Sequence, residues 1–256
     1  MKQGIMQLDR LLRGEATRFK TLKRGTLDID AAGLASVILI LGMIYGLCMG
    51  SFGLFQHGPR AVPQLLATAG KVPLLFLLTL LVTFPSLYVF NALIGSRLSL
   101  GSTLRLIIAA MAIMLAVLAS LGTIVAFFSA STTDYSFILL LNVIVFSVSG
   151  FLGMKFLLQT LHRLTLTQTA EESAAAEPSA VPEPGGALDK TENQAISANV
   201  TKIFRIWIVV FGLVGAQMAW VLRPFIGAPN VEFTLFRARE SNFFEAVGRA
   251  LTHLLG

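Results

Sequence analysis

The side chains able to do chemistry are few in this chain and stand far apart. The three histidines are His57, His162 and His253, and the one cysteine is Cys48. A zinc site needs several His, Cys or carboxylate ligands at short characteristic spacings, and none of these residues has such neighbours in the sequence. The chain also contains neither a Walker-type phosphate loop nor a nucleophile elbow. We therefore expect no enzyme activity, no metal and no cofactor.

A second set of polar side chains lies within or beside long apolar stretches, where a route for a substrate would need them. This candidate polar pathway consists of Thr79, Thr83, Ser86, Asn91 and Asn142. Such groups either line a passage for a neutral solute or make hydrogen bonds within and between helices. The second alternative is favoured, because Thr83 lies near Pro85 and can compensate for the backbone hydrogen bond that proline removes. The apolar stretches carry no charge, which argues against ion-coupled transport.

The elements that must position these residues are long runs without charge. Hydrophobic residues make up 55% of the chain and charged residues only 13%, whereas about 25% charged residues is usual in soluble domains. Five stretches contain no Asp, Glu, Lys, Arg or His: residues 34–55, 72–95, 106–130, 136–154 and 206–222. About 20 apolar residues cross a bilayer as a helix. The predicted fold class is therefore all-α, a polytopic membrane helix bundle with five transmembrane helices.

The distribution of basic residues predicts the orientation of the bundle. Lys and Arg are concentrated before the first apolar stretch, and such residues are enriched in cytoplasmic segments. We expect an N-in, C-out protein, in a membrane such as the bacterial cytoplasmic (inner) membrane. The arginines after the last stretch fit this orientation least well, and an even number of spans would place them in the cytoplasm. The net charge of +6 is then a signal of topology and not of nucleic-acid binding.

The chain divides into five segments of different composition. Residues 1–33 form a basic cytoplasmic segment with an amphipathic helix suited to anionic lipids. Residues 34–164 are the four-helix transmembrane region, and residues 203–222 are the fifth transmembrane helix. Residues 165–202 are rich in Glu, Ala and Ser and lack aromatic residues, which is typical of a disordered acidic cytoplasmic linker. Residues 223–256 form a C-terminal interfacial tail with a second amphipathic helix.

Small residues recur four positions apart in four of the five stretches, including Ser149 and Gly153 in the fourth. The candidate helix-packing residues are Gly42, Gly46 and Gly50, then Ala112, Ala116 and Ser120, and finally Gly212 and Ala216. Small residues at this spacing let helix backbones approach closely in a membrane, where lipid removes the hydrophobic drive for association. Packing within the chain accounts for most of these faces. A surplus face, best represented by the three glycines, would serve as an interface with a second copy or another membrane protein.

The turn between the second and third stretches, from Asn91 through Gly95 to Ser99, is short and leads into Leu104 and Arg105. With the polar N-terminal segment, the close spacing of the spans and the outward C-terminus, this turn makes the chain similar to the Yip1-type families of five-span membrane proteins. The resemblance covers residues 33–222 without the linker. The acidic linker and the Phe- and Arg-rich tail depart from the pattern. The resemblance implies a non-enzymatic membrane organiser or partner-binding protein.

We therefore expect a non-enzymatic scaffold or subunit of a membrane complex, acting through helix–helix and interfacial contacts. Its expected partners are the lipid bilayer, anionic lipids at the N-terminal segment, and a membrane protein or a second copy of the chain. The alternative is a channel or permease for a neutral or lipidic substrate, which a cavity reaching Asn142 would favour. A membrane enzyme is the third alternative, and a cluster of His57, Arg60 and Asp134 would be its signature.

Overall fold

The structure is a computed structural model, and it describes residues 2–15, 29–93, 100–175, 187–227, 234–236 and 241–255. All regular elements in these ranges are helices, as the sequence predicts. They are α1 (Lys2–Leu12), α2 (Ala31–His57), the short 3-10 helix η1 (Gly58–Ala61), α3 (Val62–Leu93), α4 (Leu100–Ser131), α5 (Tyr135–Ala175), α6 (Ala187–Val221) and α7 (Phe243–Leu255).

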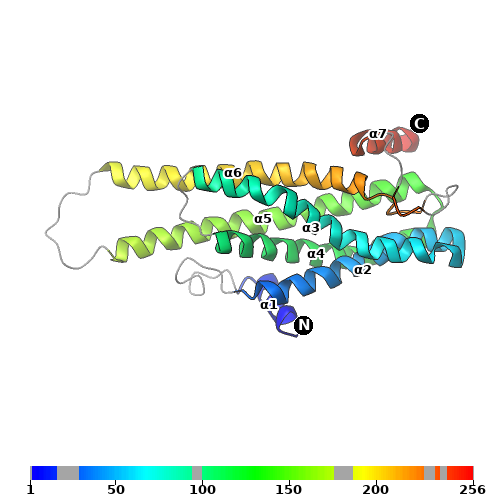
Figure 1. Ribbon diagram of the computed structural model, residues 1–256, viewed down its shortest axis with the longest axis horizontal. Helices are drawn as coiled ribbons and strands as arrows, with labels where there is room; N and C mark the ends of the chain where they lie inside the picture. The colour runs from blue at the N-terminus through cyan, green and yellow to red at the C-terminus, as the bar shows by residue number, and fades with distance from the viewer. Residues whose placement is uncertain are drawn as a thin grey trace.

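The long helices α2 to α6 run back and forth along the long axis of the molecule, so that consecutive helices are antiparallel (Figure 1). Helices α2, α4 and α6 end where α7 lies, and we call this the α7 end of the bundle. The amphipathic helix α1 packs on α2 and α4 through its buried face of Gly4, Leu8 and Leu11. Both terminal helices predicted from the sequence are therefore present, and each lies against the bundle.

Four helical segments are long and apolar enough to cross a membrane: residues Ala31–Leu87, Gly101–Ser131, Tyr135–Leu164 and Lys202–Val221. The first is 57 residues long and comprises α2 and α3, which η1 separates. Large apolar side chains such as Leu81, Phe127 and Ile206 are exposed on the outside of these segments. Their exposure implies contact with a lipid bilayer.

Helices α5 and α6 continue well beyond the apolar part of the bundle (Figure 1). Helix α5 has 41 residues, which is about 62 Å at 1.5 Å per residue and twice the thickness of a hydrocarbon core of about 30 Å. Helix therefore occupies both ends of the segment 165–202 that the sequence predicts as a disordered linker. Ala, Glu and Gln dominate residues 168–175 and have high helix propensity. Residues 176–186, the middle of that predicted linker, lie outside the described residues.

Helix α2 is the centre of the bundle and packs most extensively on α4 and α3. Its contact with α3 is close because Gly46 lies against the backbone of that helix. A Cβ atom on Gly46 would be 2.6 Å from the carbonyl oxygen of Thr68 and 2.7 Å from Cα of Ala69. Helix α6 packs on α3 and helix α5 on α4, while α5 and α6 contact each other much less. The bundle is thus an incomplete ring, opened between α5 and α6.

Candidate functional site

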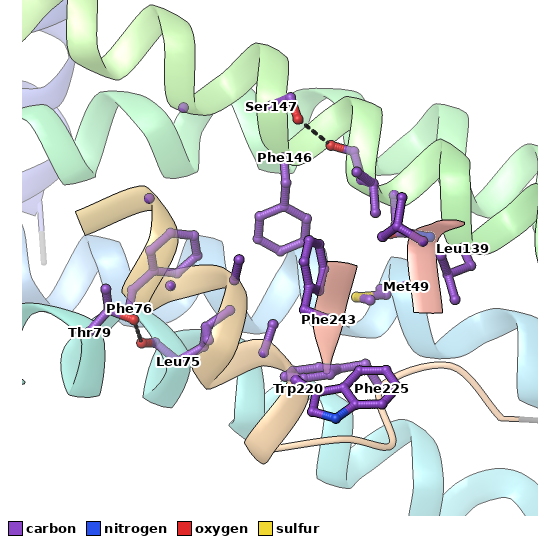
Figure 2. A pocket seen from close by; sticks show the side chains of 18 of the residues that line it. Met49, Leu75, Phe76, Thr79, Leu139, Phe146, Ser147, Trp220, Phe225 and Phe243 are labelled. Carbon is purple, nitrogen blue, oxygen red and sulfur yellow. Dashed lines mark hydrogen bonds between the residues drawn. The ribbon is translucent and has the colours of Figure 1, made fainter. Parts of the chain in front are cut away.

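The opening in the ring holds a cavity of about 1000 Å³, which we call the α5–α6 groove. Helices α5 and α6 form its walls, and residues of α3 and α4 form its floor, among them Phe76, Thr79, Ala110 and Met114. Figure 2 shows Phe76, Phe146, Trp220, Phe225 and Phe243 arranged around this space. The lining is mostly aliphatic and aromatic, and the volume is at the upper end of the range for sites of small organic ligands.

The groove is long in the direction of the helices. On α5 its lining extends from Tyr135 to Leu157, which is about 33 Å at 1.5 Å per residue. On α6 it extends from Trp207 to Trp220, which is about 20 Å on the same scale. The hydrocarbon core of a bilayer is about 30 Å thick. The shape therefore matches an extended hydrocarbon chain better than a compact polar solute.

The mouth of the groove is lateral and lies between the two walls. Ser147 and Phe151 of α5 and Gly212 of α6 both line the groove and are exposed on the bundle surface. A Cβ atom on Gly212 would meet no other heavy atom within 4 Å. These residues lie in the apolar parts of their helices, so the mouth faces the level at which lipid tails would be found.

The α7 end of the groove differs from the rest because it is cationic. Its basic lining residues are Arg223, which follows α6, and Arg249 and His253 of α7. No Asp or Glu occurs among the described lining residues. The guanidinium carbon of Arg223 lies 3.9 Å from the centre of the Trp220 ring, which is a cation–π contact. The indole N–H of Trp220 donates to the carbonyl of Ser241 and so ties the end of α6 to the start of α7.

The segment that closes this end is held by three polar residues on one face of α3. Gln64 donates from Nε2 to the carbonyls of Pro224 and Phe225, each at 3.1 Å. The hydroxyl of Thr68 lies 2.7 Å from the same Phe225 carbonyl, and Nζ of Lys71 donates to the carbonyl of Pro224 at 3.1 Å. All three side chains are buried. We call them the α3 latch, because they fix the residues after α6 that form the end wall of the groove.

The candidate polar pathway does not form one continuous route among the described residues. Thr79, Thr83 and Ser86 bond to carbonyls of their own helix, those of Leu75, Thr79 and Thr83 respectively. Asn142 accepts from the hydroxyl of Tyr45 at 2.8 Å, a bond that joins α5 to α2. Thr79 and Asn142 line the groove, whereas Thr83 and Ser86 do not. The side chain of Asn91 lies outside the described residues.

The candidate helix-packing residues occupy three different environments. Gly42, Gly46 and Gly50 face α3, where their nearest neighbours belong to Pro73, Thr68 and Leu65. Ala112 is fully buried, Ala116 is partly buried against the core, and Ser120 is exposed. Gly212 and Ala216 line the groove. Residues with the same spacing thus bring helices together on α2 and leave space beside α6.

The described residues do not gather a metal-ligand set, since no group of three His, Cys, Asp or Glu is close enough to hold an ion. Asp134 caps α5 by accepting from the backbone N–H groups of Ser136 and Phe137. Nδ1 of His57 lies 3.2 Å from the carbonyl of Gly53 in its own helix. The chain matches no protein-family model, no curated protein sequence and no solved structure.

Sequence reasoning missed the residues that give this site its character. It treated Arg223 and Arg249 only as evidence on orientation, although Trp220 and Arg223 at the end of the last span form a recognisable aromatic and cationic pair. It also did not single out Gln64, Thr68 and Lys71, which come just before the second charge-free stretch. Their spacing of four and three residues places them on one helical face, and that spacing is the signal that would have identified the α3 latch.

Proposed function

We propose that this chain is a multi-pass membrane protein that crosses the bilayer five times and holds an amphipathic lipid in the α5–α6 groove. The observation that carries the proposal is the groove itself, which is apolar, about 1000 Å³ in volume and open sideways between α5 and α6. A lipid would enter through the mouth from the surrounding bilayer without leaving the apolar phase. The proposed role is the binding or handling of a lipid, without catalysis.

The geometry favours this lipidic role over a channel for a neutral solute. The polar groups that would line a channel are mostly bonded to carbonyls of their own helices, as the hydroxyls of Thr79 and Thr83 show. A polar solute would therefore find few free partners in an otherwise apolar space. A lipid chain needs none.

A scaffold or complex-subunit role, like that implied by the Yip1-type resemblance, remains a second proposal with less support. The glycine face of α2, which is the best candidate for a partner interface, is covered by α3 of the same chain. A partner would have to bind another surface of the bundle. The two proposals are compatible, because a lipid could occupy the groove while a protein partner binds an outer surface of the bundle.

The test is a lipid-retention measurement on the purified full chain. Gly212→Phe places a large side chain in the mouth, at a position where an added Cβ meets no heavy atom within 4 Å. Gly70→Phe is the matched control, since Gly70 is an exposed glycine on α3 that also has open space around it and does not line the groove. Native mass spectrometry should show a lipid adduct with the parent chain and Gly70→Phe, and a several-fold weaker adduct with Gly212→Phe. Equal adducts for all three proteins, or none, would overturn the proposal.

A further inference from the structure

The polar end of the groove specifies which lipid is bound. We propose that the ligand is an anionic glycerophospholipid whose phosphate headgroup binds at the α7 end, to Arg223 together with Arg249 and His253. This inference rests on the proposed function and adds the class of headgroup to it.

The first argument concerns where selectivity can arise. Lipid tails in a bilayer are as apolar as the leucines and phenylalanines of the groove, so transfer of an acyl chain from the bilayer into the groove gains little. The polar end must therefore decide which lipid is held. In this groove, the cationic residues all come from the chain after α6 and lie at one end, with no carboxylate among the described lining residues.

The second argument concerns the arginines themselves. Stacking on Trp220 at 3.9 Å fixes the guanidinium of Arg223 at the end of the groove. Arg249 forms an ion pair with Glu245 at 2.8 Å, but more than half of each side chain is exposed. Exposed pairs of this kind contribute little free energy, so Arg249 is able to exchange Glu245 for an anion of the ligand.

The third argument separates a phosphate from a carboxylate. A carboxylate and the phosphodiester of a glycerophospholipid each carry one negative charge on two oxygens, and one arginine can contact both oxygens. The phospholipid headgroup has ester oxygens beside the phosphate as well, and phosphatidylglycerol adds two hydroxyl groups, so further donors also find acceptors. The cationic groups here come from two elements, the segment after α6 and α7. A phospholipid headgroup offers acceptors to donors from both elements, whereas a fatty acid offers only its two carboxylate oxygens.

The α3 latch fixes the position of the backbone next to Arg223 in the absence of a ligand. Gln64, Thr68 and Lys71 hold the carbonyls of Pro224 and Phe225, the two residues that follow Arg223. The backbone beside Arg223 is thus anchored to the bundle and does not depend on the ligand for its place. A preformed site of this kind binds without a large ordering cost.

The experiment uses the full chain in detergent and native mass spectrometry with three probes: dioleoyl phosphatidylglycerol, dioleoyl phosphatidylcholine and oleate. The two phospholipids have the same tails, so a difference between them reports the headgroup. The variants are Arg223→Gln and Arg249→Gln. Arg60→Gln is the matched control, because Arg60 is an exposed arginine of η1 at the same end of the bundle and does not line the groove.

We expect the parent chain and Arg60→Gln to prefer phosphatidylglycerol over phosphatidylcholine. Loss of a charge-assisted hydrogen bond should weaken phosphatidylglycerol binding by Arg223→Gln roughly tenfold or more, with little effect on phosphatidylcholine. Arg249→Gln should show a smaller decrease, and it tests the inference independently should Arg223→Gln fail to fold.

Equal binding of the two phospholipids with no effect of either variant would overturn the headgroup inference and leave the lipid-binding proposal standing. Arginine-dependent binding of oleate alone would replace the phosphate by a carboxylate and would also overturn it. Absence of all three adducts, with Gly212→Phe equal to the parent, would overturn the proposed function instead.

Discussion

The close approach of α2 and α3 gives the sharpest quantitative prediction, because Gly46→Ala adds a single methyl group where there is no room for it. The new Cβ would lie 2.6 Å from the carbonyl oxygen of Thr68 and 2.7 Å from Cα of Ala69. Both are backbone atoms, so a side-chain rotation cannot relieve the clash. The helices themselves must move apart.

The magnitude follows from that separation. A gap of roughly 0.5–1 Å forfeits about a quarter to a half of the dispersion attraction between the atoms that face each other, and overpacking a well-packed core costs about 1–3 kcal/mol. Replacing glycine by alanine in a helix works in the opposite direction by about 1 kcal/mol. Because both clashes are with backbone atoms, we place the cost in the upper part of that range and expect Gly46→Ala to lower the free energy of unfolding by about 1–2 kcal/mol after the helix gain is subtracted.

The control is Gly70→Ala, which adds the same methyl group to open space on α3. It should be neutral or stabilising by up to about 1 kcal/mol. Gly42→Ala and Gly50→Ala should fall between the two, since their nearest contacts would be 3.1 Å and 3.2 Å. The assay is equilibrium unfolding in mixed micelles with increasing sodium dodecyl sulfate, followed by circular dichroism. If Gly46→Ala unfolds at the same detergent fraction as Gly70→Ala, the α2–α3 contact is not close and the glycine face is free for another partner.

Three further predictions concern other parts of the bundle. Tyr45→Phe removes the donor from Asn142 and should lower the free energy of unfolding by about 0.6–1.7 kcal/mol, and in a double-mutant cycle with Asn142→Ala the effects should be non-additive. Independent, additive effects would contradict that bond. Lys71→Met removes a donor to the carbonyls of Pro224 and Leu235 and should make the chain at these two residues more sensitive to added protease, whereas Lys155→Met, at an exposed lysine, should not. A reporter fused after Gly256 should be active only outside the cytoplasm if the chain crosses the bilayer five times with its N-terminus inside, and cytoplasmic activity would show an even number of spans.

The long apolar helices could be predicted from the sequence because their signal is local. A run such as residues 106–130 has no charged residue, and its length alone matches a membrane crossing. The two terminal helices carry a similarly local signal in the spacing of their apolar residues. The helical ends of the 165–202 segment were missed because composition typical of disorder outweighed the helix propensity of Ala, Glu and Gln at the start of that segment.

The groove could not be predicted because its cause is not local. Gly46 and Gly212 are both glycines followed four positions later by another small residue, Gly50 and Ala216 respectively. Gly46 nevertheless lies against the backbone of α3, whereas Gly212 faces open space. The difference arises from how far apart two helices stand, which depends on every other contact in the ring. Lys71 shows the same limit, because the carbonyl of Pro224 that satisfies it comes from 153 residues away.

The arginines after the last span fit the predicted orientation poorly, and their position in the structure bears on that disagreement. In the proposed N-in orientation with five spans, the α7 end is the outer end, where Lys and Arg are ordinarily depleted. Arg223 and Arg249 are unexpected there on grounds of topology alone. Their position at the end of the α5–α6 groove would explain why they occur on this side, because the headgroup of a lipid entering from the outer leaflet would contact them. The departure from the charge rule is then explained by the binding site. The reporter experiment tests whether the α7 end is the outer end, and the headgroup experiment tests whether the arginines bind an anionic lipid.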